Sequence, residues 1–276
     1  MWFRQDLRLA DNPALCAACE RGEIIPVYIL DDQGADSWKM GGASRWWLHY
    51  ALEDLNDSLK QGLQLFQGDA LTILRNFAAQ TGAAAITWNR CYEPWRINRD
   101  THIKKELESK GIKVNTLNGS LLWEPWTIKK GDGTPYKVFT PYFRKGCLLS
   151  DEPRKPISTP INLDLFNDNN SLKDINALSL LPSTKWDIKM KSFWNIGELG
   201  ANNRLTEFLN NGVENYKVGR NIPSKPFVSR LSPHLHFGEI SPNQAWYAAK
   251  KKGDDTNIDH FCSELGWREF SYSRRA

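Results

Sequence analysis

Short apolar stretches alternate with amphipathic stretches along the first 118 residues of the chain. Five apolar runs predict strands at Trp2–Phe3, Ile24–Leu30, Leu63–Phe66, Ala83–Trp88 and Ile112–Leu117. Between them, segments 13–21, 43–61, 69–80 and 97–110 carry apolar residues at the three- and four-residue spacing of helices. Asn12-Pro13 and Asp69 suit helix starts, and glycines at 22, 62, 82 and 111 suit helix ends.

Strand and helix in alternation imply right-handed crossovers and a parallel sheet covered on both faces. We therefore predict an α/β domain with a doubly wound, parallel, five-stranded sheet of Rossmann-like type. Such sheets bind ligands beyond the carboxyl ends of their strands. The first strand, however, leads into Arg4-Gln5-Asp6-Leu7-Arg8 and has no glycine-rich phosphate loop. We interpret this charged turn as a structural Arg and Asp network that ties the strand to the next helix.

The pattern changes after residue 130. Prolines at 153, 156, 160 and 182 lie among Asn, Asp, Ser and Lys with weak periodicity, which is typical of a long connection between domains. Helical patterns return at 198–210, 242–252 and 255–273, with Ser241-Pro242 as a cap and first helical residue. We predict an α/β domain at 1–130, a linker at 131–197 and an incomplete all-α domain at 198–276.

Composition and charge add limits to this picture. A content of 41% hydrophobic and 25% charged residues is that of a globular protein. No apolar run approaches the roughly 18 residues that span a bilayer, and the N-terminus lacks a signal pattern, so we expect a cytoplasmic protein with no membrane partner. The net charge is +4, and residues 201–276 hold 11 basic and 8 acidic side chains. This excess favours a polyanion partner, although a solvated helix face explains Lys250-Lys251-Lys252 equally well.

The cysteines and histidines do not indicate a metal site. The chain has five scattered cysteines, and its single Cys-x-x-Cys, Cys16 to Cys19, lacks the second pair of ligands that structural zinc requires. His234 and His236 have no acidic or thiol ligand at workable spacing. We expect reduced thiols and no metal.

Three separated blocks of sequence resemble one known family. They are Trp2 to Leu9 with Asp11 to Leu15, then Tyr136-Lys137-Val138-Phe139-Thr140-Pro141, then Ser229 to Phe270 with Glu264-Leu265-Gly266-Trp267-Arg268-Glu269-Phe270. Together they are similar to the N-terminal part of photolyase/cryptochrome flavoproteins, of the class I cyclobutane pyrimidine dimer photolyase type. The resemblance implies an α/β domain, a long linker and a helical FAD domain. Family members continue well beyond residue 276, so we expect a truncated product or fragment that lacks part of the flavin pocket.

The resemblance implies which residues face FAD. It places Tyr216, the run Val228-Ser229-Arg230-Leu231-Ser232, Phe261 and Arg268 against the cofactor. Hydroxyls and free amides at a helix start attract a pyrophosphate, which makes this run chemically suitable. Many relatives have Thr where Val228 stands, so one hydroxyl is missing from the cradle. Taken alone, Ser232-Pro233 is also an ordinary helix start.

The resemblance also implies a face for damaged DNA. On the helix from Asp259, the side chains of Phe261, Glu264 and Trp267 or Arg268 recur at intervals of three and four and share one face. By resemblance Glu264 and Trp267 are the catalytic pair: Glu264 hydrogen-bonds a pyrimidine edge and Trp267 stacks on the flipped lesion. Arg220 matches a phosphate-binding Arg. The expected DNA-facing residues are Arg220, Glu264, Leu265, Gly266, Trp267, Arg268, Glu269, Phe270 and Ser271. The alternative is an ordinary amphipathic helix with Phe261, Leu265 and Trp267 in the core.

The resulting function hypothesis is light-driven repair of cyclobutane pyrimidine dimers by a monomeric FAD lyase. Two alternatives stay open, a cryptochrome-like FAD photoreceptor and a fragment in which only the α/β domain folds stably. Many family members also carry an antenna pigment. The folate-binding pattern has Asn-Glu shortly after Tyr-Glu, but Trp95-Arg96 follow Tyr92-Glu93-Pro94 here. A deazaflavin antenna is therefore favoured over a folate, and no antenna at all remains open; Arg45, Trp46 and Trp47 suit packing equally well.

Overall fold

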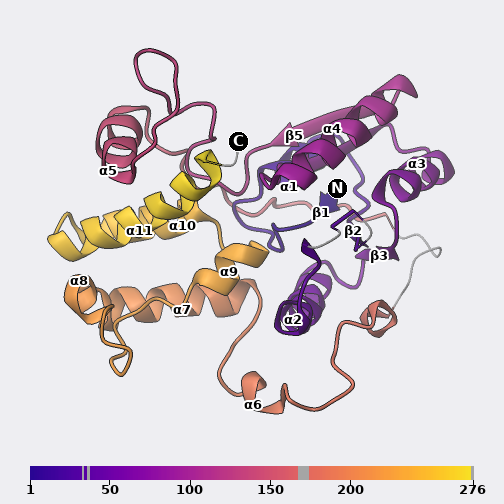
Figure 1. The fold of residues 1–276 in the computed structure, drawn as a ribbon. Coiled ribbons are helices and arrows are strands. Elements are labelled where there is room, and N and C mark those ends of the chain that lie inside the picture. The colour runs from indigo at the N-terminus through magenta and orange to yellow at the C-terminus, as the bar shows by residue number, and fades with distance from the viewer. Residues whose placement is uncertain (33, 36–37, 167–173, 275–276) are drawn as a thin grey trace.

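The computed structural model describes residues 1–274 except 33, 36–37 and 167–173. Figure 1 shows an α/β half, coloured indigo to magenta, beside a helical half coloured orange to yellow. The strands and helices of the α/β half are β1 Trp2–Phe3, α1 Pro13–Cys19, β2 Val27–Leu30, α2 Gly42–Ser58, β3 Gln64–Gln67, α3 Ala70–Thr81, β4 Ala85–Asn89, α4 Pro94–Ser109 and β5 Lys113–Leu117. The remaining α-helices are α5 Phe139–Pro141, α6 Ile188–Lys191, α7 Glu198–Asn211, α8 Tyr216–Gly219, α9 Ser232–Phe237, α10 Pro242–Lys252 and α11 Thr256–Ser273.

The five predicted strands and their parallel direction are confirmed. Within the described residues, hydrogen-bonded ladders join β1, β2 and β3 in one group and β4 and β5 in another. β1 lies next to β4 without a ladder, and their contact is made by Trp2 and Trp88, whose ring centroids are 5.5 Å apart. The spatial order is therefore β3, β2, β1, β4, β5. The second and third strands lie on one side of β1, and the fourth and fifth lie on its other side.

Side-chain caps fix the helix starts that the sequence predicts. Asn12 accepts a hydrogen bond from the amide of Leu15 at the start of α1, and Asp69 accepts one from Thr72 at the start of α3. Ser241 forms a complete capping box with Gln244 at the start of α10. These caps satisfy main-chain N–H groups that have no partner inside the helix.

The charged turn after β1 joins distant parts of the chain. The guanidinium of Arg8 is buried and donates to the carbonyls of Gly238 at 2.9 Å, Asp11 at 2.6 Å and Gly119 at 2.6 Å. The buried carboxylate of Asp11 accepts from Arg154, from the amide of Ile157 and from the hydroxyl of Ser241. The predicted structural network is confirmed, and it reaches into the linker and the helical half.

The helical half lies directly against this turn. Gly238 has a φ of 71°, and a Cβ at that position would lie 2.0 Å from the carbonyl oxygen of Gln5. Only glycine permits both the left-handed backbone and this close approach. Glu198 at the start of α7 accepts hydrogen bonds from the amides of Leu9 and Ala10. The two halves are thus joined by the Glu198 carboxylate, by a main-chain hydrogen bond from Leu7 to Phe237, and by packing of the Phe237 ring in the core of the α/β half.

The helical half has its own apolar core. Buried side chains of α7, α8, α10 and α11 pack together, including Phe208, Trp246 and Phe261. Residues 139–149, which the sequence analysis assigns to the linker, contribute Phe139, Tyr142, Phe143 and Cys147 to the same core. Packing therefore attaches this segment to the helical half. Trp46 and Trp47, by contrast, are buried in the core of the α/β half, in agreement with a packing role.

Candidate functional site

One face of α11 gathers polar and aromatic groups at the surface of the helical half. Trp267 is 45% exposed, and one turn earlier Glu264 forms an ion pair with Arg220 from the end of α8. The Arg220 guanidinium lies 5.5 Å from the ring centroid of Tyr216, which burial gives a pKa raised to about 12. The structure therefore joins two segments that lie far apart in the sequence: Tyr216 and Arg220 at α8 meet Glu264, one turn before Trp267, on α11.

The other residues of segment 264–271 face different surroundings. Leu265, Gly266, Glu269 and Phe270 lie in the interior, whereas Ser271 is exposed. Arg268 points toward the α/β half and donates to the carbonyl of Ser120 at 2.8 Å. Four of the expected DNA-facing side chains are therefore at least partly exposed at the surface of the helical half: Arg220, Glu264, Trp267 and Ser271.

Glu269 anchors α11 to the α/β half. Its buried carboxylate accepts hydrogen bonds from the amides of Leu122 at 2.9 Å and Trp123 at 3.3 Å, and from Arg268 at 2.9 Å. Burial raises the pKa of Glu269 to about 7, and the Arg268 guanidinium and the two amides act in the opposite direction. This carboxylate therefore fixes the position of the helix that carries Glu264 and Trp267.

The segment expected to hold flavin phosphates runs between α8 and α9. Ser232 begins α9 and is exposed, as are Val228 and Arg230, while Leu231 is buried. Arg230 has a φ of 53°, a left-handed conformation that is uncommon outside glycine, and the hydroxyl of Ser229 accepts a 3.4 Å hydrogen bond from Leu231. The segment offers hydroxyls and a guanidinium, which is a donor set that fits a phosphate. Phe261 is buried against Phe208 and Tyr216, so its ring supports the core beside this segment.

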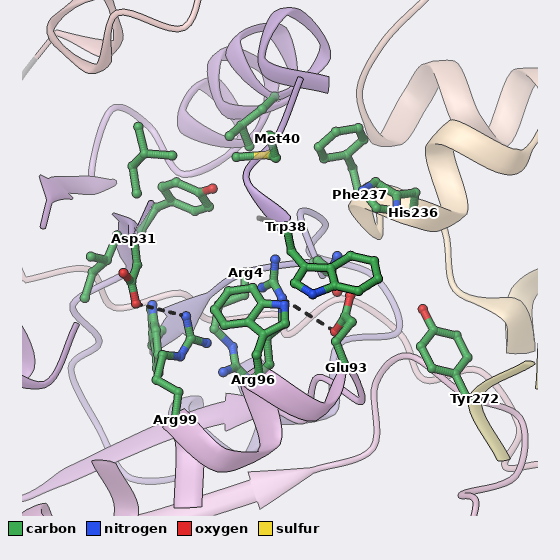
Figure 2. Close-up of a pocket in the computed structure, with 17 residues that line it drawn as sticks. Arg4, Asp31, Trp38, Met40, Glu93, Arg96, Arg99, His236, Phe237 and Tyr272 are labelled. Atoms are coloured by element: carbon green, nitrogen blue, oxygen red, sulfur yellow. Dashed lines mark hydrogen bonds and ion pairs between the residues drawn. The ribbon is translucent and has the colours of Figure 1, made fainter. Parts of the chain in front are cut away.

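A separate cavity of about 300 Å³ lies at the carboxyl ends of β1 and β2. Arg4 and Gln5 line it from the turn after β1, Asp31 from the turn after β2, and Trp95, Arg96 and Arg99 from α4. His236, Phe237 and Tyr272 enter from the helical half, as Figure 2 shows. The cavity therefore occupies the switch in strand order between β1 and β4, where ligands of doubly wound sheets bind.

The charges in this cavity are balanced, but some of its donors have no partner. Arg99 pairs with Asp31 at 3.3 Å, Arg96 with Glu93 at 3.5 Å, and Arg4 with Asp100 (Figure 2 marks the first two). Burial opposes the charged form of Arg4, yet Asp100 raises its pKa above the usual value. Within the described residues, Nε of Arg4 and Nε1 of Trp2 have no hydrogen-bond partner. Both atoms are buried, so a ligand in the cavity reaches them only if neighbouring side chains move.

This cavity was not predicted from the sequence. The absence of a glycine-rich loop after the first strand favours a structural role for the whole turn from Arg4 to Arg8. Asp6 and Arg8 do form a buried network, but Arg4 and Gln5 line the cavity. The position of polar residues after two neighbouring strands, Arg4 after β1 and Asp31 after β2, was the available signal.

The remaining sequence expectations concern metals, cysteines and membranes. In the described part of the chain, no three His, Cys, Asp or Glu side chains lie close enough together to hold a metal ion. His234 instead hydrogen-bonds Glu239, and the five cysteines are free thiols. None of the described helices combines the length and the apolar character that crossing a membrane requires.

Comparison with known proteins identifies the family. Residues 1–160, more than half of the chain, match the family model described as DNA photolyase. The chain belongs to the DNA photolyase family. The predicted family is therefore confirmed.

Individual relatives match almost the whole chain. A deoxyribodipyrimidine photo-lyase of Agrobacterium fabrum is 39% identical over 99% of this chain and 58% of its own length. Cryptochrome-1 of Arabidopsis thaliana is 29% identical over 98% of this chain and 42% of its own length. The crystal structure of a bacterial class III photolyase from Agrobacterium tumefaciens superposes with a TM-score of 0.92 at 39% identity, over 99% of this chain and 57% of the solved chain. This chain thus spans a little more than half the length of the first of these relatives.

Proposed function

We propose that this chain carries the lesion-facing part of an FAD enzyme that uses light to split cyclobutane pyrimidine dimers in DNA. The observation that carries the proposal is the exposed indole of Trp267 about one helical turn after Glu264 on α11, with Glu264 held by Arg220. Similarity to a deoxyribodipyrimidine photo-lyase supports it. Damaged DNA as partner, a monomeric state and a cytoplasmic location belong to the same proposal.

In this proposal Trp267 contributes binding affinity for the lesion, and Glu264 orients it. An everted pyrimidine pair stacks on Trp267, and stacking of this kind contributes roughly 1 to 3 kcal/mol for each base. This gain offsets the few kcal/mol that unstacking the pair from DNA costs. The Glu264 carboxylate accepts a hydrogen bond from a pyrimidine N–H, and the Arg220 ion pair holds that carboxylate in place.

The run Val228 to Ser232 would hold the phosphates of FAD, and Tyr216 would line the same binding site. Reduced FAD bound there would supply the light-driven electron transfer that splits the dimer. The protein residues contribute binding, orientation and exclusion of water. No side-chain nucleophile is needed for this chemistry.

The test is repair under illumination. The purified chain, loaded with FAD and reduced, should convert a thymine dimer in an oligonucleotide to two thymines in blue light and leave it intact in the dark, as chromatography of the digested product will show. Repair in the dark, or bound FAD with no repair in light, contradicts the proposal. A light-dependent change in a bound partner without dimer cleavage would instead assign the chain to photoreceptors of the cryptochrome kind.

We further propose that the cavity at the strand ends binds a planar heteroaromatic antenna pigment, with a deazaflavin favoured over a folate. Trp38 and Trp95 line this cavity with Arg96 and Arg99, and the guanidinium groups lie against the Trp95 ring, so the site combines aromatic surface with donors that suit carbonyl oxygens on a pigment edge. The Trp95-Arg96 pair, which departs from the folate pattern, lines this cavity.

Replacing Trp95 with Ala should weaken pigment binding about tenfold, because loss of a stacked aromatic contact costs on the order of 1 kcal/mol or more. Fluorescence titration with a deazaflavin and, separately, a reduced folate measures this and shows which pigment binds. Trp186→Ala, which removes another exposed tryptophan outside the cavity, is the matched control. Equal affinity of Trp95→Ala and the unchanged chain for both pigments contradicts the assignment.

A further inference from the structure

The exposed indole of Trp267 lies on a stack of aromatic rings. Its ring and that of Phe139 are nearly parallel, at 12°, with centroids 3.9 Å apart. Phe139 in turn stacks on Phe143, at 11° and 5.5 Å. Phe139 is 9% exposed, whereas Trp267 is 45% exposed. One face of the indole is therefore covered by Phe139, and the opposite face is open to solvent.

Close contact between α11 and the stack limits rotation of the indole. A Cβ on Gly266 would lie 2.5 Å from a ring carbon of Phe143, so glycine at this position allows the helix to approach. The ring of Phe270 packs edge-on against the rings of Trp267 and Phe139, with centroid distances of 5.8 Å and 6.0 Å. A parallel ring below and an edge at the side leave the indole one well-packed orientation.

We propose that Phe139 is a positioning residue that holds the indole of Trp267 in the plane on which an everted pyrimidine pair stacks. The inference rests on the proposed function and names a residue that acts from the covered side of the indole. Phe139 itself does not reach the lesion, because Trp267 lies between them. A ring that is already ordered loses less conformational freedom when a base stacks on it, so the supporting ring increases affinity for the lesion.

The block Tyr136 to Pro141 is one of the three that carry the family resemblance, and the resemblance alone implies no role for it. The support of Trp267 by Phe139 gives this block a role. In the structure, α5 begins at Phe139 and places that ring under Trp267 of α11, a residue far away in the sequence. The block therefore carries the support for the platform that α11 presents.

The first measurement observes the indole directly. In protein labelled with 5-fluorotryptophan, the ¹⁹F signal that disappears in Trp267→Phe belongs to Trp267. Phe139→Leu should move that signal downfield, because the ring current of the stacked phenyl is lost, and Phe139→Tyr should leave it near its original position. Phe193→Leu, which removes a 68% exposed ring outside the stack, is the control. An unmoved signal in Phe139→Leu overturns the proposal.

The second measurement compares binding to a duplex oligonucleotide that contains one thymine dimer with binding to the undamaged duplex. Phe139→Leu should bind the dimer about fivefold more weakly, which corresponds to about 1 kcal/mol, with unchanged binding of undamaged DNA. Phe139→Tyr should restore most of the affinity. If Trp267→Ala weakens dimer binding and Phe139→Leu does not, the inference about Phe139 is wrong. If Trp267→Ala binds the dimer as well as the unchanged chain does, the proposed function itself fails.

Discussion

Replacement of Arg8 with Leu should lower the free energy of unfolding by about 4 kcal/mol, because it removes a buried charge that three carbonyl groups and nearby carboxylates require. The guanidinium of Arg8 hydrogen-bonds Gly238 in the helical half, Gly119 after β5 and Asp11 in its own turn. Leu can fill part of the volume but cannot donate a hydrogen bond. Urea unfolding followed by circular dichroism measures the loss.

Two further variants distinguish loss of the charge from loss of the planar guanidinium, and a buried arginine from an exposed one. Arg8→Lys keeps the charge but replaces the planar fork with one ammonium, so it should fall between Arg8→Leu and the unchanged chain. Arg144→Leu removes an arginine whose ion pair with Asp259 is largely exposed, and it should cost less than about 1 kcal/mol. A loss below about 1 kcal/mol for Arg8→Leu would show that the turn after β1 does not hold the two halves together.

Local sequence signals predict most of the secondary structure, and the deviations have physical causes. The second strand is predicted from Ile24 but begins at Val27, because Pro26 has no N–H and Ile24 instead pairs with Leu165 from the linker. The helix predicted at 43–61 ends at Ser58, since Lys60 and Gln61 adopt positive φ values of 51° and 62°. Both differences depend on conformations or partners that periodicity does not encode.

In the candidate site, too, local spacing predicts some features, whereas contacts between residues far apart in the chain determine the others. A helical spacing of three predicts that Glu264 and Trp267 share a face, and the structure places both at one surface of α11. The ion pair of Glu264 with Arg220 and the stack of Trp267 on Phe139 join residues far apart in the chain, and no local pattern contains them. The interior positions of Glu269 and Phe270 likewise follow from where α11 meets Leu122 and Tyr142.

Replacement of Trp267 with Ala should weaken binding of a dimer-containing duplex oligonucleotide about 5- to 150-fold and leave binding of the undamaged duplex unchanged. The factor follows from a stacking contribution of roughly 1 to 3 kcal/mol for each base. Stacking acts only on bases that leave the DNA helix, whereas the phosphates are bound by charged groups that the substitution does not alter. Fluorescence anisotropy with labelled oligonucleotides measures both affinities.

Trp126→Ala provides the matched control, because Trp126 is a similarly exposed tryptophan, at 49%, that packs against Tyr92 and Arg90. It should bind both oligonucleotides as the unchanged chain does. Trp267→Phe keeps a ring above Phe139 and should retain part of the preference for the dimer, since a smaller aromatic face still stacks. Equal loss of affinity for damaged and undamaged duplexes in Trp267→Ala would mean that the indole supports the surface rather than recognises the lesion, and lesion recognition would then have to lie elsewhere.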